Sequence, residues 1–225
     1  FPKVYVNGQL AGQWDYGYMS FRIDATPYVK LGQKNTIAVH ADTRNHGTRW
    51  YPGAGIYRKV TMTICNPVHV AHWGAFVTTP DVGDDSATVR FRATIENHRE
   101  AETQVTVTTV LLDPAGKPIA RGGRTEVVPA RGSREFEQAI AVTDPQRWDI
   151  GSPKLYHVRT LVQVDGRLVD REITPFGIRT FRFTANDGFH LNGRRVQLYG
   201  VCLHHDQGPL GGAFYPRAME RQLEI

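Results

Sequence analysis

The sequence predicts a mainly β chain whose last part begins a unit of a different kind. Short runs that alternate apolar and polar residues recur along most of its length, and clusters of Gly, Pro, Asn and Asp separate them. No convincing helical pattern lies between these runs, which is typical of β-sandwiches. Beyond Phe183 an apolar run leads into helix formers, as at the start of a parallel βα unit.

The first region, residues 1–66, is expected to hold several short strands. The stretch "KVYVNGQLAGQW" predicts a hairpin around Asn7-Gly8, because Asn-Gly suits the tight turn between two strands. Alternating runs follow at residues 19–29, 35–42 and 57–66. Asn66-Pro67 is a turn signal and indicates a boundary between domains.

The second region, residues 67–178, is expected to form a β-sandwich of roughly 100 residues. Its runs are rich in Val, Thr and Ile, and turn signals such as Asp165-Gly166 separate them. The predicted strands lie within residues 69–80, 87–97, 101–113, 134–142 and 155–183. A Cys…Trp…Cys pattern is absent, so an immunoglobulin likeness is one of architecture. Trp148 and Tyr156 are expected to pack in the sandwich, with a sugar-stacking platform as the alternative.

The third region, residues 179–225, begins with a hairpin around Asn192-Gly193. An apolar run at residues 196–203 then predicts a buried strand, and residues 216–225 predict a helix with Met219 and Leu223 on one stripe. A single βα unit has no partner against which to bury its strand. We therefore expect a parallel sheet or barrel to continue beyond this chain, and expect the chain to be cut at both ends.

Composition excludes some classes of function. The net charge of +5 comes from Lys and Arg scattered singly or in pairs, without the basic patch of a nucleic-acid-binding protein. No run approaches the roughly 20 apolar residues of a membrane helix, so neither nucleic acid nor membrane is an expected partner. Cys65 and Cys202 lack metal-ligand or disulfide spacing and are expected to be small buried hydrophobic residues.

Three stretches resemble glycoside hydrolase family 2, which includes β-galactosidases, β-glucuronidases and β-mannosidases. They are "RWYPGAGIYRKV" (residues 49–60), "PFGIRTFRF" (175–183) and "NGRRVQLYGVCLHHD" (192–206). The resemblance implies the end of a jelly-roll sugar-binding domain (1–66), an immunoglobulin-like β-sandwich (67–178) and the truncated start of a (β/α)8 catalytic barrel (179–225). The form of the last stretch is most similar to β-galactosidases.

The resemblance also implies the candidate sugar-binding residues. Active sites of such barrels lie on the loops after the strands, where His204 would contact the sugar and Asp206 could bind two hydroxyls or cap the next turn. Arg49 stands where several members carry an acidic residue, so it could instead bind a hydroxyl or pair with a carboxylate. Trp50 or Tyr51 could stack on a sugar face.

A metal site at His204-His205 is not expected, because neighbouring side chains on an extended segment point to opposite faces. His205 is expected to pack or face solvent. No cofactor is implied.

The resemblance implies a retaining β-glycosidase, most similar to those that act on β-galactosides. Its two catalytic glutamates would lie on later barrel strands. No Asn-Glu pair occurs here, so this chain is expected to hold no catalytic residue and to be inactive alone. Its expected partners are the carbohydrate substrate and the rest of the barrel, and a homo-oligomer stays open. A non-catalytic carbohydrate-binding double sandwich is the alternative. A periplasmic or secreted location would suit polysaccharide breakdown.

Overall fold

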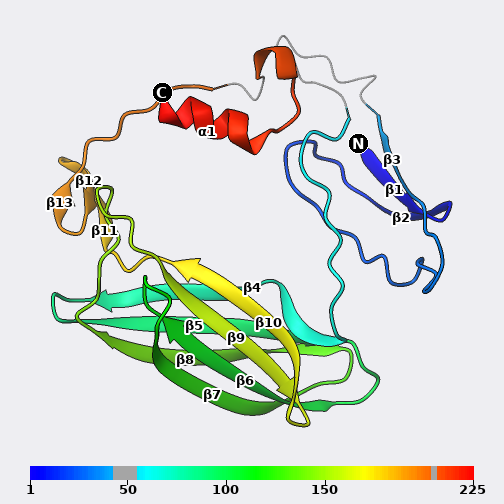
Figure 1. The fold of residues 1–225 in the computed structure, drawn as a ribbon, viewed down its shortest axis with the longest axis horizontal. Coiled ribbons are helices and arrows are strands. Elements are labelled where there is room, and N and C mark those ends of the chain that lie inside the picture. Colours follow the sequence, from blue (N-terminus) through cyan, green and yellow to red (C-terminus); the bar gives the residue numbers. More distant parts are fainter. Residues whose placement is uncertain (43–54, 204–206) are drawn as a thin grey trace. The chain divides into compact units, whose positions relative to one another are not determined.

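The structure, a computed structural model, describes residues 1–42, 55–203 and 207–225 (Figure 1). It separates into one unit formed by Thr63–Gly200 and another that combines Phe1–Met62 with Val201–Ile225. No helix among the described residues is long and apolar enough to span a membrane.

Two antiparallel sheets form the sandwich of the Thr63–Gly200 unit (Figure 1). One sheet has the order β4-β5-β8 and the other β10-β9-β6-β7. Their bounds are β4 Val68–Val82, β5 Ser86–Asn97, β6 Thr103–Leu112, β7 Pro118–Val128, β8 Gly132–Thr143, β9 Tyr156–Val164 and β10 Arg167–Phe176. The β-sandwich predicted from the alternating runs is therefore confirmed.

The core lies between the two sheets and follows the two-residue period of the strands. Along β5 every second residue from Ala87 to Asn97 is buried, and the residues between them are exposed or half-buried. In the facing sheet, the same alternation along β9 buries Tyr156, Val158 and Val162. Phe91 and Phe136 are the largest of the fully buried side chains.

Strand β7 is absent from the sequence-based prediction, because its "RGGR" segment breaks the alternation. Gly122 pairs with Thr109 of β6 in this strand. A side chain at Gly122 would meet Gln138 of β8, since an added Cβ would overlap the Gln138 Oε1 atom. The glycine therefore reflects a close approach between the edges of the two sheets rather than a loop.

The predicted Asn-Gly and Asp-Gly turns are confirmed. Asn7 and Gly8 both have positive φ, at 51° and 83°, as the two-residue hairpin turn between β1 (Pro2–Val6) and β2 (Gln9–Gln13) requires. Asp165-Gly166 joins β9 to β10 in the same way, and Asn192-Gly193 joins β12 (Gly188–Leu191) to β13 (Arg194–Arg195).

A small three-stranded sheet follows the sandwich in the same unit, in the order β11-β12-β13. Its strands are β11 Phe181–Thr184, β12 Gly188–Leu191 and β13 Arg194–Arg195. Asn192 Nδ2 donates a hydrogen bond to the Trp148 carbonyl at 2.9 Å, and Arg194 pairs with Asp149 at 2.7 Å. These contacts hold the small sheet to the segment before β9.

The other unit has a three-stranded sheet in the order β2-β1-β3. Its elements are β1 Pro2–Val6, β2 Gln9–Gln13, β3 Ile37–Ala41, the 3-10 helix η1 Gly208–Leu210 and the helix α1 Pro216–Glu224. Strand β3 and helix α1 confirm the predictions from residues 35–42 and 216–225.

Two predicted strands of this region are wrong. Residues 19–29 and 57–66 alternate as predicted but form no strand, and Val60 and Ile64 are exposed. An alternating run becomes a strand only where a neighbouring strand accepts its backbone hydrogen bonds, and neither run joins a sheet among the described residues. Cys65 and Cys202 are also exposed, against expectation, because they lie in segments without strand structure.

The predicted first barrel strand is not confirmed. Residues 196–203 form no strand, and Leu198, Tyr199 and Val201 are exposed. An apolar run of this kind needs other strands and helices to cover it. Among the described residues it joins no sheet, and only Val196 N at its start bonds to the Phe189 carbonyl of β12, at 2.8 Å.

Replacing Phe136 tests the described core. Phe136→Ala is expected to lower the free energy of unfolding by about 3–5 kcal/mol, because it empties a fully buried aromatic site. Phe76→Ala is the control, since Phe76 is largely exposed and the change should cost less than about 1 kcal/mol. Urea denaturation measures both values, and equal losses would contradict the described core.

Candidate functional site

The sugar-binding residues predicted from the sequence lie outside the described residues. Arg49 and Trp50 belong to residues 43–54, and His204 and Asp206 belong to residues 204–206. The same holds for His205. Their roles therefore stay predictions.

The described segments that follow these two loops are in contact with each other. Phe214 N donates a hydrogen bond to the Tyr57 carbonyl at 2.7 Å. The Tyr57 hydroxyl donates to the Gly17 carbonyl at 3.2 Å. Gln207 reaches the same region, because its Oε1 accepts a hydrogen bond from Tyr215 N at 3.4 Å. Chain segments about 150 residues apart in the sequence thus meet within one unit.

Trp148 and Tyr156 pack, as one of the two interpretations predicts. Tyr156 is buried, and its hydroxyl accepts a hydrogen bond from Gln146 N at 2.9 Å. The Arg179 guanidinium covers Trp148 at 5.2 Å from the ring centroid. Gly177 lies so close to Trp148 that an added Cβ would be 2.8 Å from the Trp148 Cβ. Both rings therefore have protein partners.

An exposed aromatic pair stands at a bulge in β4. Trp73 has a φ of 56° and an exposed fraction of 80%, and its ring stacks on His72 at 4.6 Å. Gly74 allows this bulge, because a Cβ there would lie 2.7 Å from the Ala71 carbonyl oxygen. The bulge turns a flat aromatic face outward, where it could stack on a ring or on another protein surface.

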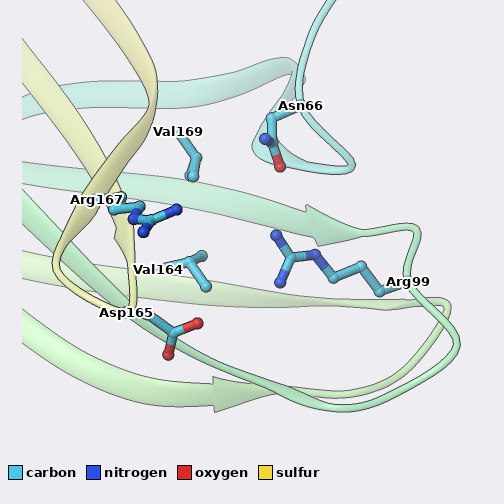
Figure 2. A pocket seen from close by; sticks show the side chains of 6 residues that line it. All are labelled: Asn66, Arg99, Val164, Asp165, Arg167 and Val169. Atoms are coloured by element: carbon cyan, nitrogen blue, oxygen red, sulfur yellow. The ribbon is translucent and has the colours of Figure 1, made fainter.

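One end of the sandwich carries an open pocket of about 470 Å³ (Figure 2). Its lining residues are Asn66, Arg99, Val164, Asp165, Arg167 and Val169. Figure 2 shows the Arg99 side chain reaching across from the turn after β5, with the β9–β10 hairpin on the other side. The lining holds two guanidinium groups and one carboxylate, so it can donate hydrogen bonds to hydroxyl or carboxylate oxygens.

Asn97 holds the loops of this end together. It is the last residue of β5 and is 1% exposed. Its Nδ2 lies 3.0 Å from the carbonyl oxygens of both Ala101 and Pro129. Its Oδ1 accepts from Arg99 N at 3.0 Å. One buried amide therefore satisfies backbone groups from the β5–β6 and β7–β8 turns.

Removing this amide should destabilise the sandwich strongly. Asn97→Ala is expected to cost about 3 kcal/mol of unfolding free energy, because it leaves buried carbonyl groups without a donor. Thr125→Ala removes only an exposed hydroxyl that pairs with Thr106, and it should cost less than about 0.5 kcal/mol. Urea denaturation of both variants gives the comparison, and a loss below 1 kcal/mol for Asn97→Ala would contradict this role.

A group of metal-ligating side chains lies beside Asn97. His69, Glu96 and His98 have ligand atoms that all lie within 4.8 Å of one another. The His69 side chain is 14% exposed, that of Glu96 27% and that of His98 58%. No sequence pattern predicts this group. His69 and Glu96 are 27 residues apart in sequence and meet only through the register of β4 and β5.

Burial raises the pKa of Glu172 on β10, and the nearby Asp170 carboxylate adds to the shift. Asp170 itself accepts a hydrogen bond from Val70 N at 2.8 Å, which connects β10 to β4 across the two sheets. Because the fold holds the Glu172 proton more tightly than the unfolded chain does, Glu172 lowers stability as the pH rises through its raised pKa.

The Glu172 shift predicts a pH-dependent gain from a neutral replacement. Glu172→Gln is expected to raise the unfolding midpoint at pH 7 by less than about 5 °C, and to lose this gain below about pH 4, where the wild-type carboxyl is protonated in both states. Glu102→Gln, at an exposed position, controls for the loss of one charge. Circular dichroism melting curves at both pH values measure the effect. The same gain at both pH values would contradict the burial of a charge as its cause.

Comparison with known proteins gives matches along nearly the whole chain. Residues 68–179 match the family described as glycosyl hydrolases family 2, and this stretch includes every strand of the sandwich. A β-galactosidase of Bacteroides ovatus is 41% identical over 224 residues, which cover 99% of this chain and 26% of that protein.

Solved structures share the fold at similar coverage. A family 2 glycosyl hydrolase of Bacteroides cellulosilyticus gives a TM-score of 0.90 at 37% identity, covering 99% of this chain and 31% of that one. A β-glucuronidase of Bacteroides uniformis gives a TM-score of 0.88 at 28% identity, covering 99% of this chain and 28% of that one. The chain therefore spans only about a quarter to a third of the proteins it matches.

Proposed function

We propose, because this chain belongs to glycosyl hydrolases family 2, that it is part of a retaining β-glycosidase that removes terminal β-linked sugars, with β-galactosides as its substrates. The observation that carries the proposal is the similarity to the Bacteroides ovatus β-galactosidase, which extends over almost every residue of this chain. Residues 1–66 would then close a jelly-roll domain, residues 67–178 would form the immunoglobulin-like domain, and residues 179–225 would begin the barrel.

The sugar site would combine two loops of this chain. His204 would exchange a hydrogen bond with a sugar hydroxyl, since a neutral imidazole both donates and accepts. Asp206 would accept from two hydroxyls, while Arg49 donates to another and Trp50 stacks on an apolar sugar face. The hydrogen bond between Phe214 and Tyr57 supports this arrangement, because it joins the segments that continue from the two loops.

The bond-breaking carboxyl groups would come from outside this chain. A retaining mechanism needs an acid/base and a nucleophile whose carboxyl groups lie about 5–5.5 Å apart. Several described glutamates form ion pairs instead: Glu126 and Glu135 pair with arginines on the sandwich, and Glu224 pairs with Arg217 on α1. This chain would thus bind and orient the sugar, and the rest of the barrel would cleave the bond.

Kinetics of the full-length protein test the proposal. It should hydrolyse nitrophenyl β-galactoside, and His204→Ala should lower kcat/KM by roughly 100-fold, because a hydrogen bond that strengthens in the transition state is lost. His205→Ala is the matched control and should change kcat/KM less than about threefold, since the neighbouring side chain is expected to point away.

Three results would change the proposal. A preference for β-glucuronide would overturn the galactoside substrate and keep the β-glycosidase. Binding of galactosides without hydrolysis would favour a non-catalytic carbohydrate-binding protein. Equal effects of the two histidine variants would remove His204 from the sugar site.

A further inference from the structure

We propose that His69, Glu96 and His98 form a zinc-binding site at the end of the sandwich. The site lies on the Thr63–Gly200 unit and uses none of the residues assigned to sugar binding. The inference therefore does not depend on the proposed function.

The strand register brings the three side chains together. His69 on β4 and Glu96 on β5 are direct cross-strand partners. Side chains two residues apart on an extended chain share a face, so His98 follows Glu96 on the same side while Asn97 points into the core. His98 N also donates a hydrogen bond to the Pro67 carbonyl at 2.9 Å, which fixes its backbone beside the start of β4.

The distances from Glu96 to the two histidines suit a small tetrahedral ion, and all three ligand atoms lie within 4.8 Å of one another. Glu96 Oε2 lies 3.5 Å from His69 Nε2 and 3.1 Å from His98 Nε2. Zinc at about 2.0–2.1 Å from each ligand in a tetrahedron requires ligand atoms about 3.3 Å apart. Two imidazoles and one carboxylate are a donor set that zinc uses, and water would complete the coordination.

The outer contact of His69 directs its Nε2, rather than its Nδ1, toward the Glu96 carboxylate. Its Nδ1 lies 2.8 Å from the Asn66 carbonyl oxygen, which can only accept a hydrogen bond. Nδ1 therefore carries a proton, and in the neutral ring Nε2 presents a lone pair toward the Glu96 carboxylate. A backbone carbonyl that orients a histidine in this way is a common outer partner of metal ligands. Two facing acceptors are stabilised when a cation lies between them.

One adjustment is needed for binding. The two imidazole rings stack at 5.3 Å with an angle of 10° between their planes. An ion in the plane of one ring cannot lie in the plane of a parallel neighbour, so one ring must turn. His98 can do so, because its side chain is the most exposed of the three and it follows the end of β5. The His69 ring stays fixed by its hydrogen bond to Asn66.

Zinc titration of the full-length protein, stripped of metal, tests the site. Isothermal titration calorimetry should show that the wild type binds one more Zn²⁺ per chain than His98→Ala, or binds it at least about tenfold more tightly, since loss of even an outer partner costs this much. Glu96→Gln should show the same loss. His72→Ala removes another exposed histidine of β4 and should bind zinc as the wild type does.

The choice of variants distinguishes a loss of zinc binding from a loss of folding stability. His98 is exposed, so His98→Ala should leave the metal-free unfolding midpoint unchanged, while added zinc should raise the midpoint of the wild type and of His72→Ala only. If the wild type and His98→Ala bind zinc with equal stoichiometry and affinity, or if neither binds it, the three residues are only an imidazole–carboxylate cluster and the proposal is overturned.

Discussion

Strand β5 is hydrogen-bonded to β4 on one side and to β8 on the other, and its side chains alternate in direction along its whole length. This alternation sets the inner face of one sheet, because Val89, Phe91 and Ile95 all point toward the facing sheet. A shift of one residue would place these side chains in solvent and Arg90 and Arg92 in the core. Such a shift would cost free energy because it buries charged side chains, and this cost fixes the register of the sandwich.

The same register arranges the polar end of the sandwich. Asn97 continues the inward series, and its amide binds the neighbouring turns. Glu96 and His98 therefore point outward, where Glu96 faces His69 on β4. The core and the candidate zinc site thus use opposite faces of β5. A change in the register between β4 and β5 would therefore also separate the metal-ligating side chains.

The sequence predicts local features of this fold better than distant pairings. The Asn-Gly and Asp-Gly turns require positive φ at both residues. The identity of these two residues alone is enough to predict such a turn. Residues 57–66 alternate as a strand does, yet they form none, because strand formation also depends on a pairing neighbour. Gly122 interrupts the alternating pattern of β7, so the pattern does not predict this strand. The neighbour that a side chain at Gly122 would meet is Gln138, on another strand. The group formed by His69, Glu96 and His98 is equally hard to predict from the sequence, because its members meet only through strand register.

Of the candidate sugar site, the sequence supplies residues and loops through family resemblance, and the described residues supply only the contact between the flanking segments.

The proposed sugar site requires that the loop containing Arg49 and Trp50 and the loop containing His204 and Asp206 bind the same sugar. Family membership and the hydrogen bond between Phe214 and Tyr57 support it. The most direct measurement is a crystal structure of the full-length protein with galactose bound. We expect His204 to hydrogen-bond to the sugar and Arg49 or Trp50 to touch the same molecule. A galactose bound by residues outside both loops would contradict it.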